Sequence, residues 1–225
     1  MSQLSLGIAL SDDAKFTNFY APMGTTQHIA LRSLTEKSHQ SVFLSWPGGT
    51  GLSHLLQAAC HQEQDSIYLP LGEVAEASPK NLFDRLETHR LVCLDDMHSV
   101  IARTSWQHSV FNLYNRCLEN GTNMIFSAHC RVDSLGVVLP DLLSRLKSGL
   151  VIHFSDYREE DLRGLLKYRA QIRGLVLTDE VALYILARLS RTTSAVMLAL
   201  DTLDRASMVE KRPVTLPFAK KVLEM

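Results

Sequence analysis

A glycine-rich stretch is the first feature of this 225-residue chain that could do chemistry, because it lies between a short apolar run and a helical pattern. The stretch reads Trp46-Pro47-Gly48-Gly49-Thr50-Gly51-Leu52-Ser53-His54-Leu55. Glycines allow positive φ, their backbone N–H groups can point inward, and a helix start adds the positive end of its dipole. The stretch therefore predicts a loop that wraps phosphate groups. A tight strand-to-helix turn without a ligand is the alternative.

The loop departs from the consensus G-x-x-x-x-G-K-[ST] at two positions. Gly51 and Ser53 fit the pattern. Trp46 stands in the place of the first glycine, and Leu52 stands in the place of the lysine. Because that lysine neutralises charge on the β and γ phosphates, we expect weaker binding of a triphosphate than of a diphosphate, and no efficient hydrolysis. The nucleotide-binding candidates in the loop are Pro47, Gly48, Gly49, Thr50, Gly51, Leu52, Ser53 and His54.

Two acids, Asp95 and Asp96, end the apolar run 91–94 further along the chain. In phosphate-loop proteins an acid at this place holds Mg²⁺ directly or through water, and the next acid can orient the attacking water. We therefore take Ser53, Asp95 and Asp96 as the candidate magnesium ligands. The alternative for the two acids is the N-cap of a helix that follows a buried strand.

Short apolar runs and the helical patterns between them define the elements that must position these residues. The runs cover residues 41–45, 66–69, 91–94, 123–127 and 151–154. The helical patterns cover residues 53–62, 82–88, 106–120 and 141–146. This alternation predicts an α/β fold with a five-stranded parallel sheet and helices on both faces. After residue 154 only helical spacing continues, which predicts a small α-helical domain.

Composition narrows the class of protein. Apolar residues make up 46% of the chain, which excludes disorder, and 23 Lys plus Arg against 24 Asp plus Glu predict neither nucleic-acid nor membrane binding. The four scattered cysteines predict buried free thiols in a reducing cytoplasm. No run approaches the roughly 20 apolar residues that span a bilayer, so a cytoplasmic location is expected. The nine histidines show no spacing typical of metal ligands, and no zinc site is expected.

These motifs resemble the Hda family of AAA+ proteins, which are regulators of replication initiation related to DnaA. The glycine loop matches the family's G-K-[ST]-H-L pattern except at the lysine, and Leu94–Met97 is similar to its second nucleotide motif. Phe16–Phe19 is similar to the entry of the ATPase domain, where aromatic residues pack near the base, and this adds Phe19 to the nucleotide-binding candidates. Leu139–Leu146 is similar to the segment that presents an arginine finger, and Leu203–Ser207 to the last stretch of the lid.

The resemblance implies a division into an AAA+ nucleotide-binding domain over residues 13–156 and a helical lid domain over 157–225. The first dozen residues precede any periodic element, which predicts a flexible tail over 1–12. The resemblance also implies that Arg145 is a catalytic residue, an arginine finger supplied in trans to ATP bound by DnaA. The alternative for Arg145 is a surface ion pair with Asp141, four residues earlier on a helix.

The family's two sensor positions do not carry the expected residues here. They fall at His129 and Ser194, with Ser127 and Arg191 nearby. Together with the missing lysine, these departures imply a site that holds a nucleotide as a structural ligand. The resemblance implies a nucleoside diphosphate, ADP in the first place, with Mg²⁺ as an optional companion.

The predicted tail contains a short motif of its own. Gln3–Ile8 resembles the Q-L-x-L-x-[LI] peptide with which bacterial proteins dock on the sliding clamp, the β subunit of DNA polymerase. In such a peptide the glutamine offers an amide to a polar notch, and the apolar side chains enter pockets in an extended conformation. Gly7 replaces a common proline, so the tail should lose more entropy on binding. The clamp-binding candidates are Gln3, Leu4, Ser5, Leu6 and Ile8. A tail without a partner is the alternative.

The function that the resemblance implies is negative regulation of DNA replication initiation. The protein would dock on the DNA-loaded clamp and stimulate hydrolysis of DnaA-bound ATP, the regulatory inactivation of DnaA, with no efficient ATPase activity of its own. Sequence-specific DNA binding and a membrane partner are not expected, and the oligomeric state stays open. The rival interpretation is an autonomous AAA+ ATPase of the clamp-loader or helicase-loader type. A third is a scaffold that binds no nucleotide.

Overall fold

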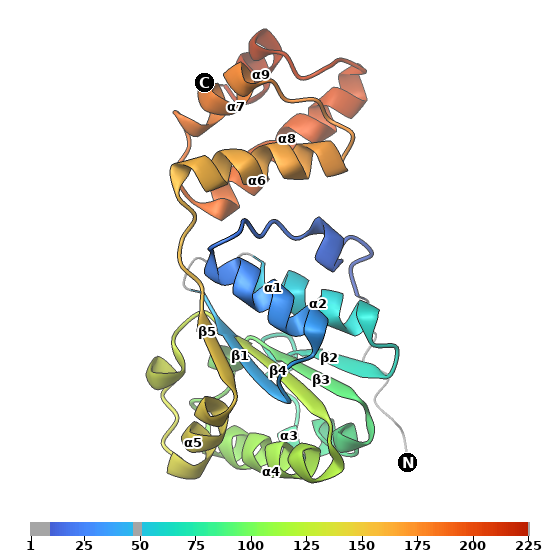
Figure 1. The fold of residues 1–225 in the computed structure, drawn as a ribbon, viewed down its shortest axis with the longest axis vertical. Coiled ribbons are helices and arrows are strands. Elements are labelled where there is room, and N and C mark those ends of the chain that lie inside the picture. The colour runs from blue at the N-terminus through green and yellow to red at the C-terminus, as the bar shows by residue number, and fades with distance from the viewer. Residues whose placement is uncertain (1–9, 47–50, 225) are drawn as a thin grey trace. The chain divides into compact units, whose positions relative to one another are not determined.

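The computed structural model describes residues 10–46 and 51–224, and the chain divides into two compact units, residues 1–154 and 155–225 (Figure 1). The clamp-binding candidates and Pro47, Gly48, Gly49 and Thr50 lie outside the described residues. None of the helices described combines the length and the apolar character that a membrane crossing requires.

A five-stranded parallel sheet forms the centre of the first unit. Its strands are β1 (Ser41–Ser45), β2 (Ser66–Pro70), β3 (Leu91–Asp95), β4 (Asn123–Ala128) and β5 (Leu150–His153). The strand order is β2-β3-β4-β1-β5, and every neighbouring pair is parallel. All residues of β1 and β3 are buried, as expected for strands whose two faces are both covered by crossover helices. The predicted α/β fold is confirmed.

Helices cover both faces of this sheet (Figure 1). One face is covered by α1 (Thr26–Glu36) and α2 (Leu52–Gln62). The other face carries α3 (Pro79–Leu82), α4 (Thr104–Asn120) and α5 (Pro140–Ser148). Gly121 ends α4 in a left-handed conformation with φ of 73°.

The helix predicted over residues 82–88 is wrong as a single element. The chain forms α3 and then a separate 3-10 turn at Leu86–Thr88, because Arg85 between them adopts a left-handed conformation with φ of 60°. A residue in that conformation interrupts the hydrogen-bond ladder of a right-handed helix. Apolar spacing alone does not reveal such a break.

The second unit is helical throughout its regular structure. It contains α6 (Glu159–Ile172), α7 (Asp179–Leu186), α8 (Thr193–Glu210) and α9 (Leu216–Val222). Threonine side chains accept hydrogen bonds from the first turns of α7, α8 and α9. Val196, Ala199, Leu200 and Leu203 form the buried face of α8, and the predicted helical domain is confirmed. Arg173, which caps α6, lies 2.6 Å from a carboxylate oxygen of Asp201 on α8.

The prediction of buried free thiols is confirmed for Cys60, Cys93 and Cys117. Cys130 is also a free thiol, but it is only half-buried, so its predicted burial is wrong. Cys130 lies after the end of β4, where the chain leaves the sheet. There the covering helices no longer shield both sides of the backbone.

Candidate nucleotide-binding site

Gly51 connects the phosphate-loop segment to α2. It is the N-cap of that helix and adopts a left-handed conformation with φ of 110°. A Cβ atom at this position would lie 3.0 Å from Cε2 of Phe19, which is closer than side chains normally pack. Both the backbone angle and the neighbouring ring therefore require glycine here.

Leu52, which replaces the phosphate-loop lysine, is part of the hydrophobic core. It is the first residue of α2, and only 1% of its surface is exposed. The helix buries Leu55 and Leu56 on the same side, against the sheet. An apolar side chain at this place gains more from burial than from facing a charged ligand. The described structure thus shows a core residue where a phosphate-binding cation would stand.

Trp46, in the place of the first glycine, is buried as well. Its exposed fraction is 2%, and its ring centroid lies 5.8 Å from that of Phe154 at the end of the first unit. Its backbone N–H donates to the carbonyl oxygen of Ala128, 3.1 Å away, which continues the pairing of β1 with β4. Trp46 therefore extends the core at the carboxyl end of β1.

The chain before α1 lies along α2 and brings Phe19 to the candidate site. The ring centroids of Phe19 and His54 are 5.7 Å apart, and Nε2 of His54 donates to the carbonyl oxygen of Lys15 at 2.8 Å. Ser11 lies in the segment predicted as a flexible tail, yet its N–H donates to Gln57 on α2 at 2.9 Å. Phe19 and His54 are thus together beside Gly51, as the nucleotide-binding interpretation requires.

Asp95, at the end of β3, is buried and bonded on both carboxylate oxygens. Its Oδ2 accepts from the hydroxyl of Tyr68 at 2.6 Å, and its Oδ1 accepts from the hydroxyl of Ser127 and from the N–H of Asp96. Burial in the first place, and then the negative charge of Asp95, raises the pKa of Tyr68. Tyr68 therefore stays protonated and donates.

The Ser53 side chain is close enough to the Tyr68 hydroxyl to lower its pKa, opposing the effect of burial. Ser53 and Asp95, two of the three magnesium candidates, are therefore both near this hydroxyl. A carboxylate has about four lone-pair positions, and three of those of Asp95 are used within the chain. This donor set of oxygen atoms fits Mg²⁺ held by the Ser53 hydroxyl, with Asp95 acting through water.

Asp96, the third magnesium candidate, lies beside two histidines. It adopts a left-handed conformation with φ of 57°, ahead of the 3-10 turn Met97–Ser99. Its carboxylate Oδ1 lies 3.4 Å from Nε2 of His129 and 4.0 Å from Nδ1 of His98. Burial, followed by the charge of Asp95, raises the pKa of Asp96, and burial, followed by the charge of His129, lowers the pKa of His98.

Sequence spacing did not reveal this cluster, because His129 is 31 residues from His98. The signal that was available is their place after β3 and β4, since carboxyl ends of neighbouring parallel strands meet at one edge of a sheet. The other sensor position, Ser194, is on α8, where its hydroxyl donates to Thr192. Arg191 pairs with Glu159 at 3.1 Å.

Arg145, the candidate arginine finger, is half-buried on α5. Its guanidinium carbon lies 6.0 Å from the ring centroid of Tyr114 on α4. Within the described part of the chain no ion pair joins Arg145 to Asp141. An arginine that rests on an aromatic face keeps its full positive charge and its hydrogen-bond donors for another partner.

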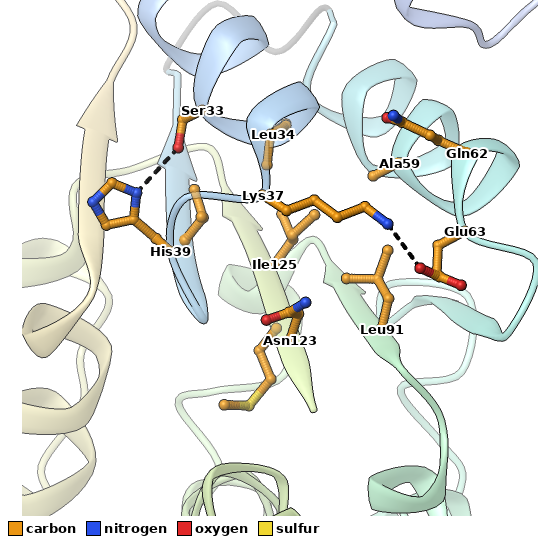
Figure 2. Close-up of a pocket in the computed structure, with 12 residues that line it drawn as sticks. Ser33, Leu34, Lys37, His39, Ala59, Gln62, Glu63, Leu91, Asn123 and Ile125 are labelled. Atoms are coloured by element: carbon orange, nitrogen blue, oxygen red, sulfur yellow. Dashed lines mark hydrogen bonds and ion pairs between the residues drawn. The ribbon is translucent and has the colours of Figure 1, made fainter. Parts of the chain in front are cut away.

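A small, mainly apolar pocket lies at the opposite edge of the sheet, where β3 and β4 begin (Figure 2). Ile125 and Leu91 line its floor, and an ion pair of 2.8 Å between Lys37 and Glu63 crosses it. The hydrogen bond from Lys37 lowers the pKa of Glu63. None of the predicted site residues lines this pocket, so it is separate from the candidate nucleotide site.

Replacing Tyr68 by phenylalanine should lower the free energy of unfolding by about 1.5–3 kcal/mol, because the buried Asp95 carboxylate would lose a donor. Urea denaturation measures this change. The matched control is Tyr114→Phe, which removes a hydroxyl bonded to the neutral side chain of Ser148. That control should cost only about 0.5–1.5 kcal/mol. Equal losses in the two variants would contradict the assigned role of Tyr68.

The five-stranded parallel sheet with helices on both faces, followed by a helical unit, is the AAA+ fold, and solved structures share it. Domain III of DnaA from Thermotoga maritima superimposes with a TM-score of 0.80 and 20% sequence identity, covering 96% of this chain and 98% of that chain. DnaA from Aquifex aeolicus with bound AMPPCP superimposes with a TM-score of 0.73 and 20% sequence identity, covering 90% of this chain and 71% of that chain. RuvB, the Holliday junction branch migration motor of Thermotoga maritima, superimposes with a TM-score of 0.64 and 15% sequence identity, covering 93% of this chain and 73% of that chain.

A family model matches the second unit of the chain. Residues 159–223, from the start of α6 to the end of α9, match the family model described as Hda, lid domain. The C-terminal helical unit of the chain therefore matches an Hda lid, and the chain as a whole shares its fold with domain III of DnaA. The predicted resemblance is confirmed.

Proposed function

We propose that this protein is a negative regulator of replication initiation that acts on DnaA rather than on its own nucleotide. The Hda lid over residues 159–223 is the observation that carries the proposal, together with the DnaA-like AAA+ fold. The regulator stimulates hydrolysis of ATP bound by DnaA and shifts the initiator to its ADP form. Its direct partners are DnaA and the sliding clamp on DNA.

The state of the protein's own phosphate loop supports an action on a partner's ATP. Leu52 is a core residue in the place of the lysine that would neutralise the β and γ phosphates. His129 and Ser194 replace both sensors. Because three contributors to hydrolysis are missing, the chain's own site binds a nucleoside diphosphate, ADP in the first place, as a structural ligand. If Mg²⁺ accompanies it, Ser53 and Asp95 hold the ion.

Arg145 is the residue that would act on the nucleotide of DnaA. A guanidinium beside a γ-phosphate stabilises the charge that develops in the transition state. In the free protein the Tyr114 ring orients this side chain, and no ion pair with Asp141 competes for it. The catalytic role is supported by this geometry and by the similarity of its segment to the family's arginine-finger segment.

Docking through Gln3, Leu4, Ser5, Leu6 and Ile8 completes the proposal. The peptide lies outside the described residues, and its assignment rests on the sequence motif. A clamp loaded on DNA would hold the regulator close to DnaA bound at the same DNA, which raises its effective concentration. We accordingly expect stimulation to depend on the loaded clamp.

The test of the proposed function is ATP hydrolysis by purified DnaA with the clamp loaded on DNA, with and without this protein. Acceleration supports the proposal. Absence of acceleration, combined with ATP turnover by this protein alone that Asp95→Asn abolishes, would instead identify an autonomous ATPase of the clamp-loader or helicase-loader type. An unchanged melting temperature with ADP would identify a scaffold without nucleotide.

The substitution Leu52→Lys should strengthen ATP binding about 10- to 100-fold and ADP binding by less, because a charge-assisted hydrogen bond contributes about 1.5–3 kcal/mol. Since Leu52 is 1% exposed, the nucleotide-free variant should also melt at a lower temperature. Isothermal titration calorimetry and thermal melting measure the two effects. Leu52→Met is the control that keeps an apolar side chain, and it should change neither affinity. Unchanged ATP affinity in the lysine variant would rule out the missing cation as the cause of weak triphosphate binding.

A further inference from the structure

We propose that Asp96, His98 and His129 form a binding site for a divalent transition-metal ion of the zinc class. The three side chains converge where β3 and β4 end, and their ligand atoms all lie within 4.8 Å of one another. This site is distinct from the Ser53 and Asp95 pair, which offers oxygen atoms only. The inference does not depend on the proposed function.

The distances between the donor atoms match the requirements of zinc. Donor atoms about 2.0–2.1 Å from a tetrahedral zinc ion stand about 3.3–3.4 Å apart. Nε2 of His129 lies 3.4 Å from Oδ1 of Asp96, and Nδ1 of His98 lies 4.0 Å from the same oxygen. The distance from His129 to Asp96 already fits a tetrahedral zinc site. A small rotation of the partly exposed His98 ring would shorten its distance to Asp96 to the same range.

Two neighbouring strands hold the three ligands in place. β3 and β4 pair in parallel, so Asp96 and His129 leave the sheet side by side. The left-handed backbone of Asp96 is fixed by its N–H, which donates to the Ser127 hydroxyl at 3.0 Å. The two imidazole rings are stacked with centroids 4.4 Å apart. The hydrogen bond that the ion would replace is a long one of 3.4 Å from the His129 N–H to Nδ1 of His98.

The donor set selects the class of ion. Two imidazole nitrogens and one carboxylate oxygen suit zinc, cobalt and nickel, whereas Mg²⁺ prefers oxygen ligands only. Three protein ligands leave a fourth position open for water or another ligand. The side chains of Asp96 and His98 are 31% exposed and that of His129 is 44% exposed, so an ion reaches the site from solvent.

Metal binding by the full chain, freed of metal with a chelator and desalted, tests the proposal. Isothermal titration with Zn²⁺ should show one site, and Co²⁺ should give the visible absorption of a tetrahedral centre. Excess Mg²⁺ should not compete. His129→Ala should weaken Zn²⁺ binding at least about 10-fold and remove the Co²⁺ absorption. Because His129 is half-exposed, the variant should keep the melting temperature of the metal-free protein.

Two controls separate this site from unspecific capture. His89→Ala removes a histidine whose Nδ1 lies 2.7 Å from Asp65 Oδ1, an exposed histidine–carboxylate pair outside the cluster, and should leave Zn²⁺ affinity unchanged. Cys130→Ser removes the neighbouring thiol and should do the same. No Zn²⁺ binding by the wild type, equal affinity in His129→Ala, or loss of binding in either control would overturn the proposal.

Discussion

Replacing Arg145 by alanine is expected to abolish the stimulation of ATP hydrolysis by DnaA, with a loss of roughly 10³-fold or more in the stimulated rate. The reason is that an arginine finger acts on charge that develops only in the transition state. Removing it leaves the complex able to assemble but unable to stabilise that charge. The measurement is phosphate release by ATP-bound DnaA with the loaded clamp present, at saturating concentrations of the regulator.

Lys147→Ala is the matched control for this variant. Lys147 lies on the same helix and pairs with Asp133, so its removal changes the surface charge of α5 by the same amount. The control should keep the stimulation. Both variants should still associate with the clamp, and both should keep the melting temperature of the wild type, because neither side chain is fully buried. If Arg145→Ala stimulates as well as Lys147→Ala, the catalytic role proposed for Arg145 is wrong.

Replacing Gln3 and Leu6 together by alanine is expected to lower the affinity for the sliding clamp about 100-fold. Withdrawing one leucine from an apolar pocket costs about 1.5–3 kcal/mol, and the lost amide hydrogen bond adds about 0.5–1.5 kcal/mol. Surface plasmon resonance on immobilised clamp measures this change. Stimulation of DnaA should fall in parallel when the clamp is limiting.

Ser2→Ala changes the same segment outside the motif and should bind the clamp like the wild type. All nine first residues lie outside the described structure, so an unchanged melting temperature is the check that the substitutions leave the fold intact. Clamp binding retained by the double variant would place the docking surface elsewhere on the chain. It would not alter the assignment of the AAA+ fold, which rests on the described residues.

Much of the fold follows from local patterns. The runs that became β1 and β3 are apolar without interruption, and such runs are typical of strands buried on both faces. The boundaries of α3 and of the turn after it did not follow from the pattern, because they depend on the left-handed conformation of Arg85. That conformation depends on how the segment packs, and the apolar spacing of the segment is the same with or without it.

Part of the candidate site also follows from local patterns, and part of it does not. The glycine loop, the acids after β3 and the similarity of Phe16–Phe19 to a known ATPase segment were all visible in the sequence, and the structure brings Phe19, Gly51 and His54 together. The hydrogen-bond donor to Asp95 could not be predicted from the sequence. Tyr68 is on β2, and its hydroxyl meets Asp95 only because β2 pairs with β3 in register.

By itself, the sequence determined the class of fold, the place of the glycine-rich stretch and the leucine in the position of the consensus lysine, because strand and helix periodicity and the glycine pattern are local properties of the chain. Only the tertiary structure decided that Leu52 joins the core, that Arg145 rests on Tyr114, and that Asp96 meets two histidines. These contacts join residues far apart in the chain. They depend on the order of the strands in the sheet, and that order is settled by how the helices pack on its two faces.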